Sequence, residues 1–83
     1  MKIYLGKSGL NQTWQDDFPK TTECFKCGSN ARVMFVGIEN DEGEFVCNLH
    51  KNKKGKFWPH DAISIASYLC ENCFEVTSII NQA

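Results

Sequence analysis

The sequence predicts a small, mostly β fold in which antiparallel hairpins are joined by one four-cysteine metal site. Three observations lead to this prediction: the chain has only 83 residues, strand-like segments alternate with turns, and two C-x2-C pairs stand far apart. A domain of this size buries only about 60% of the surface that its unfolded chain exposes. A bound metal would therefore add stability that the hydrophobic core lacks.

The N-terminal segment, 1–21, is predicted to be an arm packed on a domain that spans residues 22–83. Residues 2–5 have the composition of a short strand. The stretch that follows is rich in glycine and polar residues, and it contains Trp14 and Phe18. We expect these two aromatic side chains to pack the arm against the domain.

Four further segments complete the expected secondary structure. Residues 31–38 and 44–49 are rich in β-branched and apolar residues and flank a short polar turn, which predicts a β-hairpin. Residues 62–69 contain Ile63 and Ile65 with Ser64 and Ser67 and are assigned to a strand, because a cysteine pair of this kind normally joins two strands; a short helix is the alternative. Residues 74–80 are the last expected strand.

The two C-x2-C pairs carry the predicted metal chemistry. Two residues between cysteines allow a tight turn to point both sulfur atoms at one ion, so each pair is half of a tetrahedral site. The four expected ligands are Cys24, Cys27, Cys70 and Cys73. Four thiolates fill the shell of one Zn²⁺ per chain, whereas a catalytic zinc keeps an open position for water. Because the sequence also lacks a recognisable catalytic motif, we expect no enzymatic activity.

The chain resembles the zinc-ribbon group of small domains in two segments, CFKCG at 24–28 and CENC at 70–73, with strands between them. The resemblance covers about residues 22–80, implies a structural zinc scaffold, and leaves the subfamily unassigned. Gly28 permits the positive φ at which backbone amides turn back toward a thiolate. Phe74 takes the matching place after the second pair, for which we therefore expect a looser turn.

Iron and additional ligands are the alternatives at this site. Rubredoxins hold one iron with two similar cysteine pairs, and softness does not separate iron from zinc at four thiolates. The lysine-rich insertion and the missing second glycine favour zinc over a rubredoxin-like electron carrier. Cys47 and His50 are spaced as C-x2-H and, with His60, form an alternative ligand set. Cys47 lies in a predicted strand, however, where a free cysteine is expected to be a small buried hydrophobe.

Charge bounds the choice of partner. The formal charge is −1; four ionised thiolates add four negative charges and Zn²⁺ returns two, which gives −3 and disfavours polyanions. One loop opposes this trend, because its lysines would neutralise phosphates while its aromatic rings stack bases. Its residues are Lys51, Lys53, Lys54, Lys56, Phe57 and Trp58. We expect a protein or nucleoprotein partner, with RNA or single-stranded DNA binding as the alternative, and no small-molecule substrate is evident.

Cysteine usage and hydropathy predict the compartment. No apolar run approaches the roughly 18 residues of a membrane-spanning helix, and residues 1–10 contain no signal-peptide core. The chain has five cysteines, an odd number that suits metal binding in a reducing compartment better than a disulfide framework. We therefore expect a cytoplasmic protein with no membrane segment.

Overall fold

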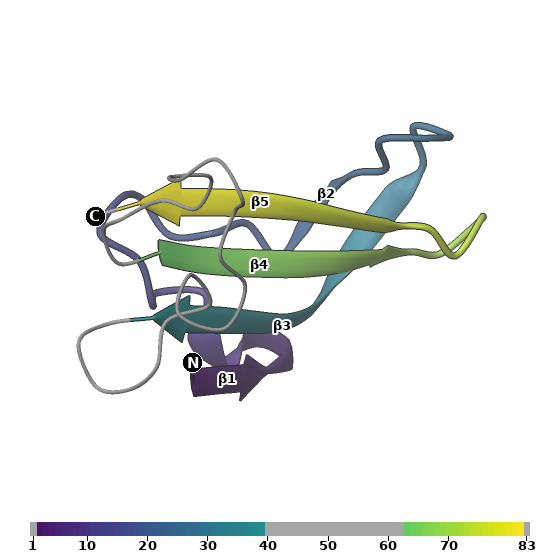
Figure 1. The fold of residues 1–83 in the computed structure, drawn as a ribbon. Coiled ribbons are helices and arrows are strands. Elements are labelled where there is room, and N and C mark those ends of the chain that lie inside the picture. The colour runs from purple at the N-terminus through teal and green to yellow at the C-terminus, as the bar shows by residue number, and fades with distance from the viewer. Residues whose placement is uncertain (1, 40–62, 83) are drawn as a thin grey trace, which may run out of the picture.

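The computed structural model describes residues 2–39 and 63–82. Its elements are β1 (Lys2–Leu5), the 3₁₀ helix η1 (Gly6–Gly9), β2 (Thr21–Glu23), β3 (Asn30–Glu39), β4 (Ile63–Cys70) and β5 (Val76–Gln82). All strand pairs are antiparallel, and η1 is the one helical element of the described residues. The predicted mostly β, antiparallel architecture is confirmed (Figure 1).

The strands form one sheet in the order β1, β3, β4, β5. β3 lies at its centre: β4 pairs along one side, while β1 and β2 share the other side at opposite ends of the strand. β3 runs away from the first cysteine pair and β4 returns to the second, so both cysteine pairs lie at the same end of the sheet (Figure 1). The sheet thereby brings together two motifs that are far apart in sequence.

Four of the five expected strands are present, including residues 31–38, which lie within β3. The first occupies residues 2–5 as predicted, and the ambiguous 62–69 segment is the strand β4 rather than a helix. Both serines of this strand, Ser64 and Ser67, are buried, because β4 pairs with β3 on one side and with β5 on the other. The last strand, β5, begins two residues later than expected, after the turn that completes the second cysteine pair.

The pairing of β3 differs from the predicted hairpin. We expected residues 31–38 to pair with 44–49, a segment that lies outside the described residues. In the structure β3 pairs with β4 from Ala31 to Glu39, and its opposite edge is taken by β1 and β2. β3 therefore pairs with a strand that is farther away in the sequence than the expected one. That strand, β4, leads back to the second cysteine pair.

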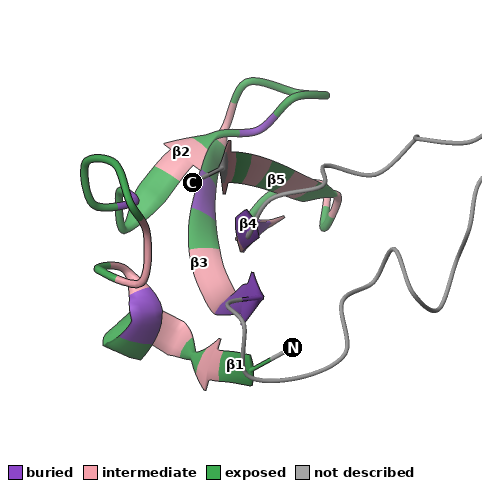
Figure 2. Cartoon of the chain, turned by 60° about the vertical axis from the view of Figure 1, so that its left-hand side comes forward, coloured by how far each residue is buried: buried purple, intermediate pink, exposed green. Residues whose placement is uncertain are grey.

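The core lies between one face of the sheet and the N-terminal segment. Its buried residues are Phe18, Cys24, Ala31, Val36, Ala66, Tyr68 and Cys70. The Tyr68 hydroxyl donates a 2.7 Å hydrogen bond to the carbonyl of Pro19, so the segment is held to β4 by a polar contact as well as by packing. Buried positions concentrate on β3 and β4, whereas β1, β2 and β5 have mostly exposed and half-buried positions (Figure 2).

Two details of the N-terminal segment matter for its packing. Phe18 is buried, but the Trp14 side chain is exposed, so only one of the two predicted aromatic residues anchors the segment. Gly9, at the end of η1, packs against β1 and β3 so closely that an added Cβ atom would lie 2.5 Å from Tyr4 Cβ and 3.0 Å from Val36 Cβ. This approach requires a residue without a side chain.

Candidate metal centre

The first cysteine pair lies in the turn between β2 and β3. The Cys24 N–H donates to the carbonyl of Ser29 at 2.8 Å, and the Gly28 N–H donates to the carbonyl of Cys24 at 3.1 Å. Gly28 has a φ of 76°, the left-handed conformation that the sequence predicted for it. The turn therefore closes on itself and directs both of its thiols to one side.

The second pair lies in the turn between β4 and β5 and has a similar backbone. The Cys70 N–H donates to the carbonyl of Glu75 at 3.0 Å, and Phe74 has a φ of 60°. The looser turn expected here is wrong, because Phe74 adopts the left-handed conformation that Gly28 has in the first turn. A side chain in this region costs about 1 to 2 kcal/mol, so the geometry of the second turn is maintained against local backbone preference.

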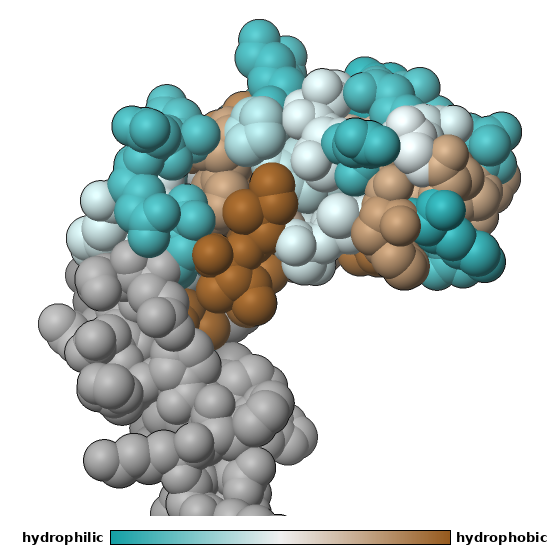
Figure 3. Space-filling view, turned by 90° about the horizontal axis from the view of Figure 1, so that it is seen from above, coloured by the Kyte–Doolittle hydropathy of each residue, from teal (hydrophilic) through white to brown (hydrophobic). Residues whose placement is uncertain are grey.

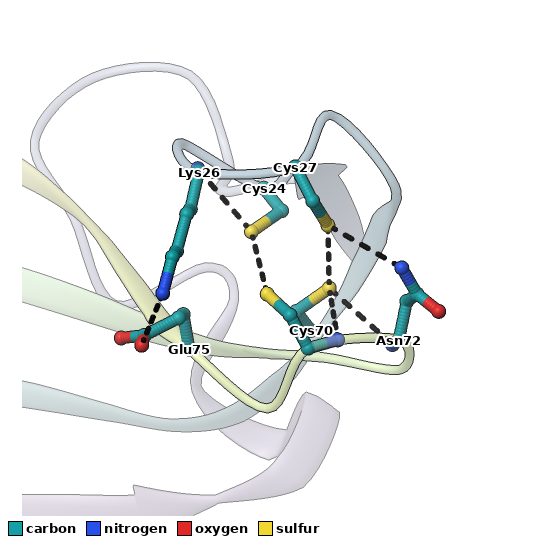
Figure 4. A network of polar contacts seen from close by, with 7 residues as sticks. Cys24, Lys26, Cys27, Cys70, Asn72 and Glu75 are labelled. Carbon is teal, nitrogen blue, oxygen red and sulfur yellow. Dashed lines mark hydrogen bonds and ion pairs between the residues drawn. The ribbon is translucent and has the colours of Figure 1, made fainter.

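The four cysteines converge at this end of the sheet. Their Sγ atoms all lie within 4.8 Å of one another, with 3.6 Å between Cys24 and Cys73 and 3.5 Å between Cys27 and Cys70. A disulfide would need about 2.05 Å, whereas four sulfurs at about 2.3 Å from a central ion stand about 3.8 Å apart in a tetrahedron. The sulfur atoms face one another between the two turns, and the spacing fits a shared metal ion (Figure 4).

Backbone amides point at the sulfur atoms in both turns. The Lys26 N–H donates to Cys24 Sγ at 3.4 Å, and the N–H groups of Asn72 and Cys73 donate to Cys70 Sγ at 3.4 Å each. The Asn72 side-chain amide also approaches Cys27 Sγ, at 3.9 Å. These donors favour the thiolate form and offset the negative charge that four sulfur ligands place around one ion.

The thiols differ in acidity. The backbone N–H groups of Cys27 and Lys26 lower the pKa of Cys24, and hydrogen bonds from the Ser29 side chain and backbone lower the pKa of Cys27 to about 6. The Glu75 N–H lowers the pKa of Cys73, but burial and the three neighbouring thiols outweigh it and raise that pKa to about 12. The first turn thus supplies the readily ionised thiols, and a metal ion must displace the proton of Cys73.

Polar contacts link the two turns to each other and to the sheet. Lys26 Nζ lies 3.2 Å from Glu75 Oε1, and the Phe25 N–H donates to Thr77 Oγ1 at 3.1 Å. The ion pair is exposed, and such pairs contribute at most about 1 kcal/mol. At the base of the turns, the Glu71 N–H donates to the Asn30 carbonyl at 3.1 Å. The cysteine cluster adds the cross-link between the parts of the turns that lie beyond the sheet.

The structure brings all four predicted ligands together. In the described part of the chain, they are the one group of three or more potential ligands close enough to hold a metal ion. Cys24 and Cys70 are buried, Cys73 is partly exposed and Cys27 is exposed. All four donors are soft sulfur atoms, a set that suits zinc or iron rather than magnesium or calcium.

Several predicted residues cannot be compared with the structure, because they lie outside the described residues. These are the alternative ligands Cys47, His50 and His60, and the loop residues Lys51, Lys53, Lys54, Lys56, Phe57 and Trp58. Conversely, sequence reasoning missed the roles of Asn72 and Ser29 beside the sulfur atoms. Both are polar residues within two positions of a cysteine, which was the available signal.

The left-handed backbone at Phe74 leads to a stability prediction. Phe74→Gly is expected to raise the free energy of unfolding of the metal-loaded protein by about 0.5 to 1 kcal/mol, because the relief of backbone strain exceeds the extra entropy of the unfolded chain. Urea denaturation measures the difference. Phe25→Gly is the matched control, since Phe25 is equally exposed but is not in the left-handed region. Destabilisation by Phe74→Gly as large as that of the control would contradict the strain argument.

The fold and the cysteine cluster define a small antiparallel β protein with a candidate metal centre compatible with a zinc-ribbon-like site. No protein-family model, curated protein or solved structure matches the chain. In the described ranges, 2–39 and 63–82, no helix has the length and apolar character needed to cross a membrane.

Proposed function

We propose that this protein is a non-catalytic, zinc-ribbon-like interaction module in which Cys24, Cys27, Cys70 and Cys73 hold one structural Zn²⁺. The observation that carries the proposal is the convergence of four sulfur donors from two distant turns. Four thiolates complete a tetrahedral shell, so the ion has no position for a reacting water or substrate. Its contribution is to join the turn before β3 to the turn after β4.

A direct test is elemental analysis of the purified protein by mass spectrometry, with circular dichroism before and after a chelator. One zinc per chain, and loss of β structure when the zinc is removed, is the expected result. Iron with the red colour of a four-thiolate centre would instead support a rubredoxin-like carrier. Absence of any bound metal from a folded chain would refute the site.

The surface beside the metal centre supports docking on a protein partner. Phe25 follows Cys24 and Phe74 follows Cys73, and the sulfurs of these two cysteines are 3.6 Å apart, so each turn carries a phenylalanine next to a sulfur donor. Their side chains are 67% and 71% exposed. Phe74 therefore bears backbone strain without the compensation of burying its ring, a combination typical of residues kept for function. Exposed aromatic residues are frequent anchors of protein interfaces.

The docking proposal can be tested with quantitative affinity purification followed by binding measurements on the purified partner. Replacing both phenylalanines, by Phe25→Gly and Phe74→Gly, is expected to weaken that direct binding at least tenfold. Leu5→Ser is the matched control, because Leu5 is 76% exposed but lies on β1. Equal binding by the double variant and the wild type would exclude this surface as the docking site. A captured partner that is lost on ribonuclease treatment, or whose binding falls steeply with salt, would favour the nucleic-acid alternative.

A further inference from the structure

Among residues 2–39 and 63–82, β5 is the terminal strand of the sheet, and no described strand pairs with its outer edge. Its seven residues, Val76–Gln82, include no proline and no charged residue, and its register with β4 is regular. Natural proteins protect edge strands with charges, prolines, bulges or very short strands, because a free edge pairs with other strands. The opposite edge of the sheet is divided between two short strands, β1 and β2, of four and three residues.

The hydrogen-bond pattern shows which backbone groups face outward. The Cys70 N–H donates to the Glu75 carbonyl at the start of the β4–β5 ladder. Hydrogen-bonded and non-hydrogen-bonded positions alternate along an antiparallel pair, so the N–H and C=O groups of Val76, Ser78 and Ile80 point away from β4. Within residues 2–39 and 63–82, no turn, loop or side-chain hydrogen bond reaches these backbone groups.

The side chains on this edge are complementary to a second copy of themselves. Val76 and Ile80 are 48% and 58% exposed, and Ser78 between them is also exposed. If two β5 strands pair antiparallel about a two-fold axis at Ser78, each Val76 lies opposite the Ile80 of the other copy. Such apolar cross-strand pairs are favourable, and a neutral residue at the axis avoids the repulsion that a charged residue would meet from its own copy.

The surface around the β5 edge is apolar, like the side chains of Val76 and Ile80. Figure 3 looks down on the side of the molecule where β5 lies in Figure 1, and it shows a strongly hydrophobic patch beside residues of intermediate hydropathy. Val76 and Ile80 pair across β4 with Leu69 and Ile65, which are themselves partly exposed. Pairing of two edges would therefore extend one apolar face across both copies.

We propose that the protein forms a homodimer by antiparallel pairing of β5 with β5 of a second copy, centred on Ser78. The interface adds about six backbone hydrogen bonds and two pairs of Val76 with Ile80. It is isologous, so it closes as a dimer and does not propagate. The antiparallel arrangement directs the metal centres of the two copies toward opposite ends of the dimer. This inference is independent of the docking function proposed above.

Two variants test the dimer in the zinc-loaded protein. Ile80→Lys puts a charged side chain opposite Val76 in both apolar cross-strand pairs, and Ser78→Pro removes an outward N–H that makes no bond to β4. Light scattering coupled to size-exclusion chromatography over a wide concentration range is expected to show a wild-type mass twice that of the 9.4 kDa chain, and both variants as monomers. Leu5→Lys, on the other edge strand, is the matched control and is expected to remain dimeric.

Amide hydrogen exchange identifies the interface independently. The N–H groups of Val76, Ser78 and Ile80 are expected to exchange slowly in the wild type and at least tenfold faster in Ile80→Lys, while the amides of β4 stay protected in both. Circular dichroism and zinc content confirm that each variant is folded. A wild type that is monomeric at every concentration would overturn the proposal, as would a dimer that persists in both variants.

Discussion

Replacing Cys24 or Cys73 by serine is expected to leave most of the chain unfolded at room temperature. Binding of structural zinc supplies roughly 10 to 16 kcal/mol in small metal-dependent domains, which equals or exceeds the whole stability of about 5 to 15 kcal/mol of an ordinary protein. Beyond the end of the β3–β4 ladder, the turns are joined by an exposed ion pair and by the hydrogen bond from the Phe25 N–H to Thr77. Circular dichroism and bound zinc, measured on the same samples, should be lost together.

Cys47→Ser is the control for this experiment, because it makes the same chemical change outside the four-cysteine cluster. We expect the variant to keep one metal ion per chain. Loss of half or more of the zinc in Cys47→Ser would show that the ligand set is wrong. Wild-type stability and zinc content in Cys24→Ser would contradict the structural role of the metal itself.

Gly9→Ala is expected to reduce the free energy of unfolding by about 3 kcal/mol, the upper end of the range for overpacked sites. The new methyl group would lie 2.5 Å from Tyr4 Cβ and 3.0 Å from Val36 Cβ, and both of these atoms are attached directly to backbone in strands. Neither can move without displacing β1 or β3. Urea denaturation of the zinc-loaded protein measures the change.

Gly6→Ala provides the comparison for Gly9. An added Cβ atom at Gly6 meets nothing within 4 Å, although the φ of 57° is unfavourable for alanine. We therefore expect a cost of about 1 kcal/mol, from backbone strain alone. If Gly9→Ala were no more destabilising than Gly6→Ala, the close approach of η1 to the sheet would not be a constraint on the fold.

The cysteine turns and the strand at 62–69 could be predicted from the sequence, because each depends mainly on a short segment of the chain. The spacing of each C-x2-C pair brings two sulfur atoms to one side of a turn, and two such turns require only that the fold place them together. The β character of 62–69 followed from its isoleucines and from its place directly before a cysteine pair. Convergence of the four cysteines was therefore predictable, because it depends on local spacing and on one long-range contact.

The neighbours of β3 were not predictable in the same way. Residues 44–49 and 63–70 have similar strand character, and consecutive segments pair more often than distant ones, so a local hairpin was the natural expectation. The pairing of β3 with β4 instead brings Cys70 to the first turn, directly opposite Ala31. Pairing is decided by the total of many weak contacts, including burial against Phe18, that no single segment reveals.

Phe74 and Gly9 show how tertiary contacts override residue preferences. Local preference argued against a left-handed backbone at Phe74, yet closing the second turn around the cysteines requires it. The need for glycine at position 9 arises from the close approach of η1 to Tyr4 on β1 and Val36 on β3. Neither contact can be read from the sequence around Gly9. Such requirements become visible only when the packed elements are known.

The direct pairing of Glu39 with Ile63 has a consequence for how this chain can vary. The chain leaves the sheet at one residue and re-enters it at the adjacent position, so residues 40–62 are an insertion within what is topologically a single hairpin. Loop-closure entropy grows only by about 0.6 kcal/mol per doubling of a connection's length, so the pairing of β3 with β4 is compatible with connections of different lengths. The insertion also joins the sheet about 30 Å from the cysteines, the length of a ten-residue strand. The Glu39–Ile63 end of the sheet is therefore a site at which the connection can be shortened, replaced or fused to another sequence without moving the cysteine turns.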